Sequence, residues 1–325
     1  MLDIPNAPST PQSSGPGEAG PSAEPTTSLV VGLDIGGSKT HGALWADGVL
    51  VGEARAGSAN VQNVTPDDAA RNLAELFLEL TPAGGADVAQ VVAGSGGVDT
   101  AEDAERLRGL IRPHAPGAAI HVVHDTRLIL AAGGARTGIA VIAGTGSVAW
   151  GVDGDGREAR SGGWGYLLGD EGGGYWVARE AVRRTLHRHD AGQQPDDLDA
   201  AVLALNGVAT PTELIGLFHS GAGRTYWAAQ SRAVFDAART GHTEAGGIID
   251  RAAEDLTQLV LDVVDVIGLP GPVVLGGGLA MHQPDLQARL RHRFSDRGID
   301  DVVFLDRDPV MGVQFLVADG GRAGR

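Results

Sequence analysis

The sequence predicts two α/β domains that face one another across a cleft. The order of three strands, a helix, a strand, a helix, a strand and a helix occurs twice along the chain. Each half also has a glycine-rich turn after its first strand, and the length of 325 residues suits about two domains. Two such domains commonly bind small molecules between them.

The first half follows a segment, residues 1–28, that is rich in Pro, Gly and Ser and is expected to be a disordered tail. The first domain is predicted to span 29–136. Its first helix has a clear start, with Thr65 as N-cap and Pro66 at the first helical position. The predicted elements are strands at 29–34, 40–45 and 49–54, a helix at 67–80, a strand at 88–93, a helix at 101–112, a strand at 120–124 and a helix at 126–135.

The second domain is predicted to span 137–325. A polar Asp-Gly-Asp-Gly turn at 153–156 joins two of its strands, and the helix-rich stretch 172–267 is expected to be an insertion. Its last helix is a candidate to return to the first domain. The predicted elements are strands at 139–143, 148–152 and 157–161, helices at 172–188, 196–205, 211–219, 223–239 and 244–267, a strand at 272–275, a helix at 284–294, a strand at 302–305 and a helix at 310–319.

The composition excludes several functions. A net charge of −16 makes binding to nucleic acid or to an anionic membrane unfavourable. The absence of cysteine excludes disulfides, thiolate zinc sites and cysteine-held iron–sulfur clusters. No apolar stretch approaches the ~18 residues that span a bilayer, and no signal-peptide pattern is present. A cytoplasmic protein is therefore expected.

The first glycine-rich turn is Asp-Ile-Gly-Gly-Ser-Lys-Thr at 34–40, and it contains the only lysine of the chain, Lys39. A strand follows it, so it is not a P-loop. Consecutive glycines in a hairpin can aim backbone N–H groups at a phosphate, and Asp34 at the strand end could hold Mg²⁺ through water. The alternative is an ordinary Gly-Gly turn with a solvated lysine.

Two further glycine motifs occupy related places. Gly-Thr-Gly-Ser at 144–147 follows the first strand of the second half. Together with the turn at 34–40 in the first half, it would clamp a triphosphate between the domains. Three glycines at 276–278 lead from a strand into a helix, a junction that lets a backbone approach a ligand closely. The alternative for this third motif is a helix entry with flexible glycines.

Asp125 directly follows a predicted strand and opens a helix. Ligands of α/β sheets bind at this end of the strands, so the carboxylate is a candidate site residue. The alternative is a helix N-cap, a role that Asp fills well.

The densest motif spans 161–176 and holds seven glycines among 16 residues, together with Trp164, Tyr166, Asp170 and Glu171. Aromatic side chains and exposed amides beside carboxylates suit a polyhydroxy ligand. The alternative is a glycine-rich surface loop in which Asp170 or Glu171 caps the following helix.

Taken in order, the segments DIGGSKT, HDTRLILAAG, GTGS, GGWGYLLGDEGGGYW and VLGGG resemble the N-acetylglucosamine kinase and BadF/BadG/BcrA/BcrD-type ATPase family. This family belongs to the superfamily of sugar kinases, heat-shock chaperones and actin. The resemblance covers about residues 29–319. It implies two ribonuclease H-like, actin-like ATPase domains facing across a nucleotide and sugar cleft, with a helical insertion in the second.

The resemblance also implies roles for individual residues. Asp34 resembles the residue that positions Mg²⁺, and Asp125 resembles the catalytic carboxylate that contacts the sugar and accepts the proton of its hydroxyl. The implied ATP-binding residues are Gly36, Gly37, Ser38, Lys39, Thr40, Gly144, Thr145, Gly146, Gly276 and Gly277. The implied sugar-binding residues are Asn60, Ser147, Gly163, Trp164, Gly165, Tyr166 and Asp170.

The implied function is an ATP- and Mg²⁺-dependent amino-sugar kinase, with the 6-hydroxyl of N-acetylglucosamine as the expected acceptor. Glucosamine and N-acetylmuramic acid or its anhydro form stay open, because eukaryotic N-acetylglucosamine kinases carry Asn where this chain has Val148. A non-catalytic sensor of ATP and sugar is the second alternative. The related activator ATPases and the zinc-containing sugar kinase and repressor family need cysteines that this chain lacks. A homodimer is one assembly that the sequence leaves open, and the purpose of the tail is open too.

Overall fold

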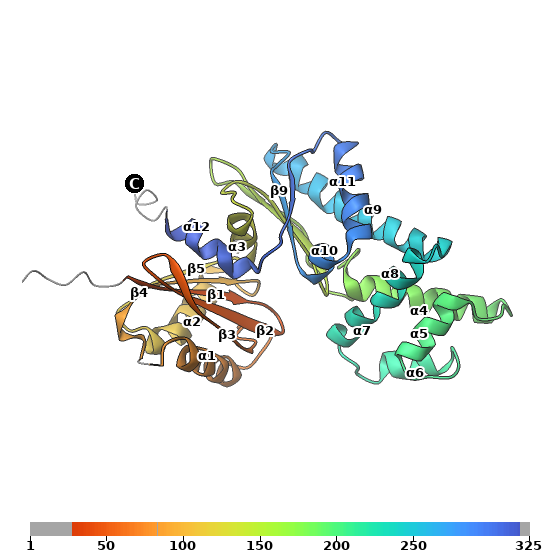
Figure 1. The fold of residues 1–325 in the computed structure, drawn as a ribbon, viewed down its shortest axis with the longest axis horizontal. Helices are drawn as coiled ribbons and strands as arrows, with labels where there is room; N and C mark the ends of the chain where they lie inside the picture. Colours follow the sequence, from red (N-terminus) through yellow and green to blue (C-terminus); the bar gives the residue numbers. More distant parts are fainter. Residues whose placement is uncertain (1–27, 83, 319–325) are drawn as a thin grey trace, which may run out of the picture.

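The computed structural model describes residues 28–82 and 84–318, which form two lobes lying side by side (Figure 1). The predicted tail lies outside the described residues except for Ser28. The amide of Ser28 donates a hydrogen bond to Asp47 Oδ1 at 2.9 Å, so this residue belongs to the folded part.

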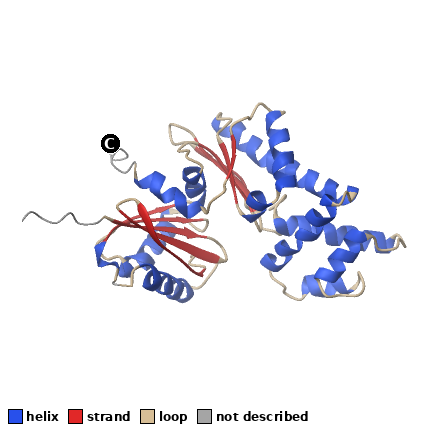
Figure 2. Cartoon of the chain, in the orientation of Figure 1, coloured by secondary structure: helices blue, strands red, loops and turns tan. Residues whose placement is uncertain are grey.

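The first lobe contains a sheet, two helices on one of its faces, and a helix on the other face that leads to the second lobe (Figure 2). Its elements are β1 (Leu29–Ile35), β2 (Lys39–Ala46), β3 (Val49–Gly57), α1 (Pro66–Leu80), the 3₁₀ helix η1 (Gly85–Asp87), β4 (Val88–Ser95), α2 (Ala101–Ile111), the 3₁₀ helix η2 (Arg112–His114), β5 (Ala119–Val123) and α3 (Asp125–Ala132).

The second lobe contains the other sheet and most of the helices. Its elements are β6 (Gly138–Ala143), β7 (Ser147–Val152), β8 (Glu158–Gly162), α4 (Gly174–Asp190), α5 (Asp197–Leu205), α6 (Glu213–His219), α7 (Arg224–Gln230), α8 (Arg232–Arg239), α9 (Thr243–Ile267), β9 (Val273–Gly276), α10 (Gly278–His282), α11 (Pro284–Ser295) and β10 (Val302–Phe304). The 3₁₀ helix η3 (Pro309–Gly312) and α12 (Val313–Val317) end the described chain.

The two sheets have the same topology. The first has the strand order β3-β2-β1-β4-β5, and the second, read in the corresponding direction, has the order β8-β7-β6-β9-β10. In each lobe the first strand is central. It pairs antiparallel with the second strand and parallel with the fourth. The shared topology confirms the internal repeat that the order of elements predicts.

Helix α1 begins as the sequence predicts. Thr65 is its N-cap and accepts a hydrogen bond from the Asp68 amide at 3.1 Å, and Pro66 occupies the first turn. The cap satisfies an amide that has no partner inside the helix. Buried Leu73, Leu76 and Phe77 then pack the helix against the first sheet.

Helix α3 packs against both sheets. Leu128 is buried with Trp45 and Val92 of the first sheet, whereas Ile129 and Leu130 are buried with Trp150 and other residues of the second sheet. Because Asp125 is the first residue of this helix, the packing of the two lobes fixes the position of its backbone.

The C-terminal segment returns to the first sheet. Val310 of η3 and Val313 of α12 are fully buried beside Trp45 and Leu128, although β10, just before them, belongs to the second sheet. The predicted helix at 310–319 is corrected in one respect, because it opens as the 3₁₀ turn η3 at Pro309.

The helical stretch differs from the prediction at one point. The single helix expected at 223–239 is two helices, α7 and α8, which meet at Ser231. The Ser231 hydroxyl donates a hydrogen bond to the Ala228 carbonyl at 2.7 Å. Such a local bond competes with the helical backbone pattern and favours a break at this point. In the described part of the chain no helix is long and apolar enough to cross a membrane.

Candidate active site

The first glycine turn is the β1–β2 hairpin at the carboxyl end of β1. The Gly36 amide donates to the Lys39 carbonyl at 3.0 Å and closes the turn, while the Ser58 hydroxyl donates to the Gly36 carbonyl at 2.8 Å. Gly37, Ser38 and Lys39 are exposed at the tip. This leaves the backbone and the lysine accessible to a ligand.

Thr40 lies differently from the rest of this predicted ATP-binding turn. Its side chain is fully buried, and its hydroxyl accepts a hydrogen bond from the Ala59 amide at 3.0 Å. Thr40 therefore fixes the 58–60 segment, which carries Asn60, to the base of the hairpin.

Asp34 is the last polar residue of β1 and is mostly buried. Burial, together with the carboxylates of Asp125 and Asp308 nearby, raises its pKa to about 7, and Lys39 opposes the shift. A carboxyl in this setting gains from a cation, because positive charge offsets both the burial and the neighbouring acids.

The donor set around Asp34 fits Mg²⁺ that is held mainly by a nucleotide. Among the described residues no group of three or more His, Asp or Glu side chains could hold a metal ion alone. Mg²⁺ keeps several waters and commonly takes one or two carboxylates plus phosphate oxygens. In this site, Asp34 would be the carboxylate that holds the Mg²⁺ of the nucleotide.

Asp125 stands at the first turn of α3, and its side chain is 17% exposed. The helix N-cap is His124, whose Nδ1 accepts from the Thr126 amide at 3.4 Å, so the cap predicted as the alternative role of Asp125 belongs to its neighbour. Asp125 Oδ1 lies 3.1 Å from His124 Nδ1 but has no hydrogen-bond partner among the described residues. A buried carboxylate oxygen without a partner is costly unless a ligand supplies a donor.

Electrostatics around Asp125 favour a proton acceptor. Burial raises its pKa, against the opposing charges of His124 and of Arg160 from the second lobe. A raised pKa makes a carboxylate a better base at neutral pH than an exposed Asp.

Two consecutive glycines after β4 pack against Asn60 and Asp125. A Cβ on Gly96 would lie 2.7 Å from Asp125 Oδ2, and a Cβ on Gly97 would lie 2.0 Å from Asn60 Oδ1. Only glycine leaves room for both side chains. The sequence reasoning missed Gly96 and Gly97, although two consecutive glycines shortly after a predicted strand were the available signal.

The second glycine turn is bound to the 161–176 segment. The Gly174 amide donates to the Gly144 carbonyl at 2.8 Å, and the Tyr175 amide donates to the Thr145 carbonyl at 3.0 Å. The Gly163 amide donates to the Ser147 carbonyl at 2.9 Å. The predicted phosphate turn and the predicted sugar segment therefore form one unit.

Asp170 holds this unit together. It is 7% exposed and adopts a left-handed backbone conformation with φ of 61°. Burial raises its pKa, but the amides of Ser147 and Gly165 donate to its carboxylate. A Cβ on Gly146 would lie 2.2 Å from Asp170 Oδ2. Asp170 thus supports the turn at 144–147, and the Ser147 hydroxyl is bound to the Glu171 carbonyl at 2.6 Å.

Two aromatic residues of the segment, Trp164 and Tyr166, lie at its surface. Trp164 is 67% exposed, with the Arg160 guanidinium 5.5 Å from the centre of its ring. Tyr166 packs edge-on against Tyr175 at 4.8 Å between ring centres. Val148, the position that departs from the family pattern, would be 3.0 Å from a Cβ on Gly163.

The third glycine motif meets the second. A Cβ on Gly277 would lie 2.6 Å from the Ala143 carbonyl oxygen, and Gly277 has a φ of 92°. Gly276 and Gly277 therefore pass directly behind the strand end that carries Gly144. The three glycine motifs follow the carboxyl ends of β1, β6 and β9, as ligand-binding turns of α/β sheets do.

Arg160 links the two lobes beside Asp125. Its guanidinium donates to the Gly163 carbonyl at 2.8 Å and lies 3.3 Å from Asp99 Oδ1 in the first lobe. Asp99 and Arg160 line a pocket of about 260 Å³ together with Val98, His124 and Trp150. Sequence reasoning missed Asp99 and Arg160, which carry no motif.

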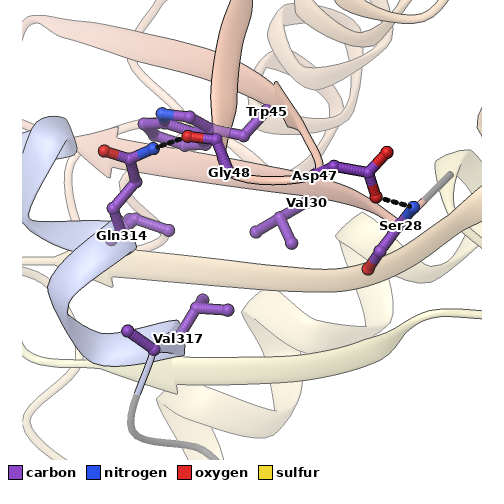
Figure 3. A pocket seen from close by; sticks show the side chains of 9 residues that line it. Ser28, Val30, Trp45, Asp47, Gly48, Gln314 and Val317 are labelled. Atoms are coloured by element: carbon purple, nitrogen blue, oxygen red, sulfur yellow. Dashed lines mark hydrogen bonds between the residues drawn. The ribbon is translucent and has the colours of Figure 1, made fainter.

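A more apolar pocket lies away from these groups (Figure 3). It has a volume of about 460 Å³ and lies between the start of β1, with Val30, and α12, with Gln314. The pocket lies at the start of β1, whereas Asp34 lies near the other end of that strand. Its acidic residue, Asp47, is already bound to the Ser28 amide. We assign it no part in the reaction.

Two lobes of the same topology, with glycine turns at their central strands, define an ATPase fold of the sugar-kinase and actin type. Residues 31–312 match the BadF/BadG/BcrA/BcrD ATPase family, and the chain belongs to that family.

Known proteins agree with this assignment. The chain is 33% identical over 252 residues to an N-acetylmuramic acid/N-acetylglucosamine kinase of Clostridium acetobutylicum, covering 76% of this chain and 82% of that protein. A solved structure of a candidate N-acetylglucosamine kinase from Chromobacterium violaceum is similar, with a TM-score of 0.71, 25% identity and coverage of 90% of this chain and 100% of that one. A ROK family glucokinase from Streptomyces griseus, at 15% identity and a TM-score of 0.56, shares the fold over 88% of this chain and 97% of its own.

Proposed function

We propose that the protein is an ATP- and Mg²⁺-dependent amino-sugar kinase that phosphorylates the 6-hydroxyl of N-acetylglucosamine. The observation that carries the proposal is the Asp125 carboxylate, which is largely buried, has a raised pKa and has an oxygen without a hydrogen-bond partner among the described residues. It packs against Gly96, next to the Gly97 that contacts Asn60. A sensor needs no proton acceptor at this point. The names of the similar kinases support the same substrate class.

The proposed reaction is a direct phosphoryl transfer. The sugar hydroxyl oxygen attacks the terminal phosphorus, a new O–P bond forms, and the bond to the bridging oxygen of ADP breaks. Asp125 accepts the proton that the hydroxyl loses. The protein otherwise positions the reactants and offsets charge, which is most of what such transfers require.

The remaining residues are proposed to bind and orient. The hairpin at 36–39 and the turn at 144–146 offer backbone amides to the phosphates, and Gly276 with Gly277 lies beneath the adenosine. Asn60 and the segment 163–166 contact the sugar, and Asp170 keeps that segment in place. Bound Mg²⁺ supplies neutralisation of phosphate charge, with Asp34 as its protein ligand.

A panel of acceptors tests the proposal. ADP release would be measured with N-acetylglucosamine, glucosamine, N-acetylmuramic acid and its anhydro form, and ³¹P NMR would locate the phosphate on the product. We expect the highest kcat/KM with N-acetylglucosamine. A preference for N-acetylmuramic acid would move the assignment within the class, in line with the Clostridium relative.

The same panel separates an enzyme from a sensor. Calorimetric binding of ATP and of one sugar, with no ADP formed in the presence of Mg²⁺, would contradict the proposed function and support a sensor. Asp125→Asn prepared in parallel excludes turnover by a contaminating kinase.

A further inference from the structure

An arginine of the helical stretch reaches the first phosphate turn from the other lobe. Arg224 is the first residue of α7. A Cβ on Gly37, at the tip of the β1–β2 hairpin, would lie 3.0 Å from a guanidinium nitrogen of Arg224 and 2.9 Å from Asn63 Nδ2. The guanidinium of Arg224 therefore lies against the exposed backbone that is proposed to bind phosphate.

Helix α7 is firmly attached to the second phosphate turn. Trp227 is 1% exposed and packs against Phe218 at 4.3 Å between ring centres. A Cβ on Gly174 would lie 3.2 Å from the Ala228 carbonyl oxygen, and the Gly174 amide is bound to Gly144. Arg224 thus projects from a rigid support that also fixes the 144–147 turn.

The charge of Arg224 is available to a ligand. Its side chain is exposed, and within residues 28–82 and 84–318 it makes no hydrogen bond or ion pair. Its positive charge also acts on Asp170, where it opposes the rise in pKa that burial causes. An unpaired guanidinium between two phosphate-binding turns is suited to phosphate oxygens.

The electrostatics of the site call for such a cation. Asp34, Asp125 and Asp308 concentrate negative charge where a triphosphate would bind. Lys39 is the only lysine of the chain, and it belongs to the first lobe. Arg224 brings a second positive charge to the same hairpin, and it comes from the second lobe.

We propose that Arg224 is a catalytic residue that donates hydrogen bonds to the terminal phosphate of ATP and stabilises the charge on it during transfer. The proposal deepens the proposed kinase function and rests on it. The guanidinium contacts non-bridging oxygens only, so it gains and loses no proton in the step.

Three variants test the proposal. Arg224→Ala removes the guanidinium, Arg224→Lys keeps the charge without the planar fork, and Arg239→Ala is the matched control. Arg239 is an exposed arginine of α8 that pairs with Asp236 of the same helix. We expect kcat of Arg224→Ala to fall roughly 100- to 1000-fold relative to Arg239→Ala, with Arg224→Lys between them.

Nucleotide binding without sugar provides a readout that does not depend on turnover. Calorimetry should show that Arg224→Ala weakens ATP binding at least about tenfold while ADP binding changes less than about twofold. A kcat of Arg224→Ala within about threefold of the control would overturn the proposal. An equal loss for ATP and ADP would overturn it too, because it would mean that Arg224 only holds the lobes together. If the wild type phosphorylates no amino sugar, the proposed function fails, and the ATP-to-ADP ratio still decides the role of Arg224.

Discussion

Replacing Asp125 with Asn changes one charge and almost no volume. The N-cap of α3 is His124, so the substitution leaves the cap in place. An Asp in the first turn of a helix contributes about 0.3–1 kcal/mol through the helix dipole, and this is lost. Burial raises the pKa of Asp125, however, so its ionised form costs stability that the neutral amide recovers. We therefore expect the melting temperature to change by no more than about 3 °C.

The effect on rate is expected to be far larger than the effect on stability. Loss of a general base typically lowers the rate ~10²–10⁴-fold, which corresponds to roughly 3–5 kcal/mol of activation free energy. Steady-state ADP release at saturating ATP, with the best sugar of the panel, gives this number. The base must be ionised, so wild-type kcat/KM should rise with pH through the raised pKa of Asp125, and the residual activity of Asp125→Asn should lack that rise.

Two results would refute this reasoning. Turnover of Asp125→Asn within about threefold of wild type would leave the mechanism without a base. A fall in melting temperature that accounts for the lost activity would mean that the carboxylate has a structural role. Calorimetry should show little change in ATP affinity, because Asp125 is expected to face the sugar.

Three further predictions concern other parts of the molecule. Gly97→Ala should raise the KM for sugar at least about tenfold, because a Cβ would displace Asn60. The control is Gly109→Ala, which adds a methyl group in open space on α2. It should leave KM unchanged and stabilise the protein by roughly 0.5–1 kcal/mol. Because burial raises the pKa of Asp34 to about 7, protons should compete with Mg²⁺, and the Mg²⁺ concentration for half-maximal activity should increase between about pH 8 and about pH 6. Asp34→Asn should abolish that dependence and lower activity, and wild-type turnover of this variant at limiting Mg²⁺ would contradict the assignment. Deleting 1–27 should change neither melting temperature nor turnover, since the segment has little apolar content; a large loss of either would mean that it binds to the lobes.

Features set by neighbouring residues could be predicted from the sequence. The start of α1 follows from Thr65 and Pro66, and the glycine turns follow from their composition and their place after strands. The repeated order of elements was sufficient to predict two α/β domains, and the strand order within each sheet is a finding of the structure.

Features that depend on distant residues could not be predicted. Arg224 is about 190 residues from Gly37 in the sequence, and no local pattern distinguishes it from the other arginines. Asp99 and Arg160 are also far apart in the sequence, and only the folded structure brings them into contact. The break at Ser231 depends on which of two local hydrogen-bond patterns the surrounding packing favours.

The double packing of α3 bears on how the specificity of such an enzyme can evolve. The chain passes between the lobes at 133–137 and again at 305–308, and both passages adjoin elements that pack on this helix. If one lobe rotates about α3 and these two passages, each atom of that lobe moves in proportion to its distance from the helix. The proposed base is at the end of the helix itself, whereas the segment 161–176 belongs to the second lobe. Substitutions in that segment can therefore reshape the acceptor pocket for a different sugar while the proton acceptor keeps its place.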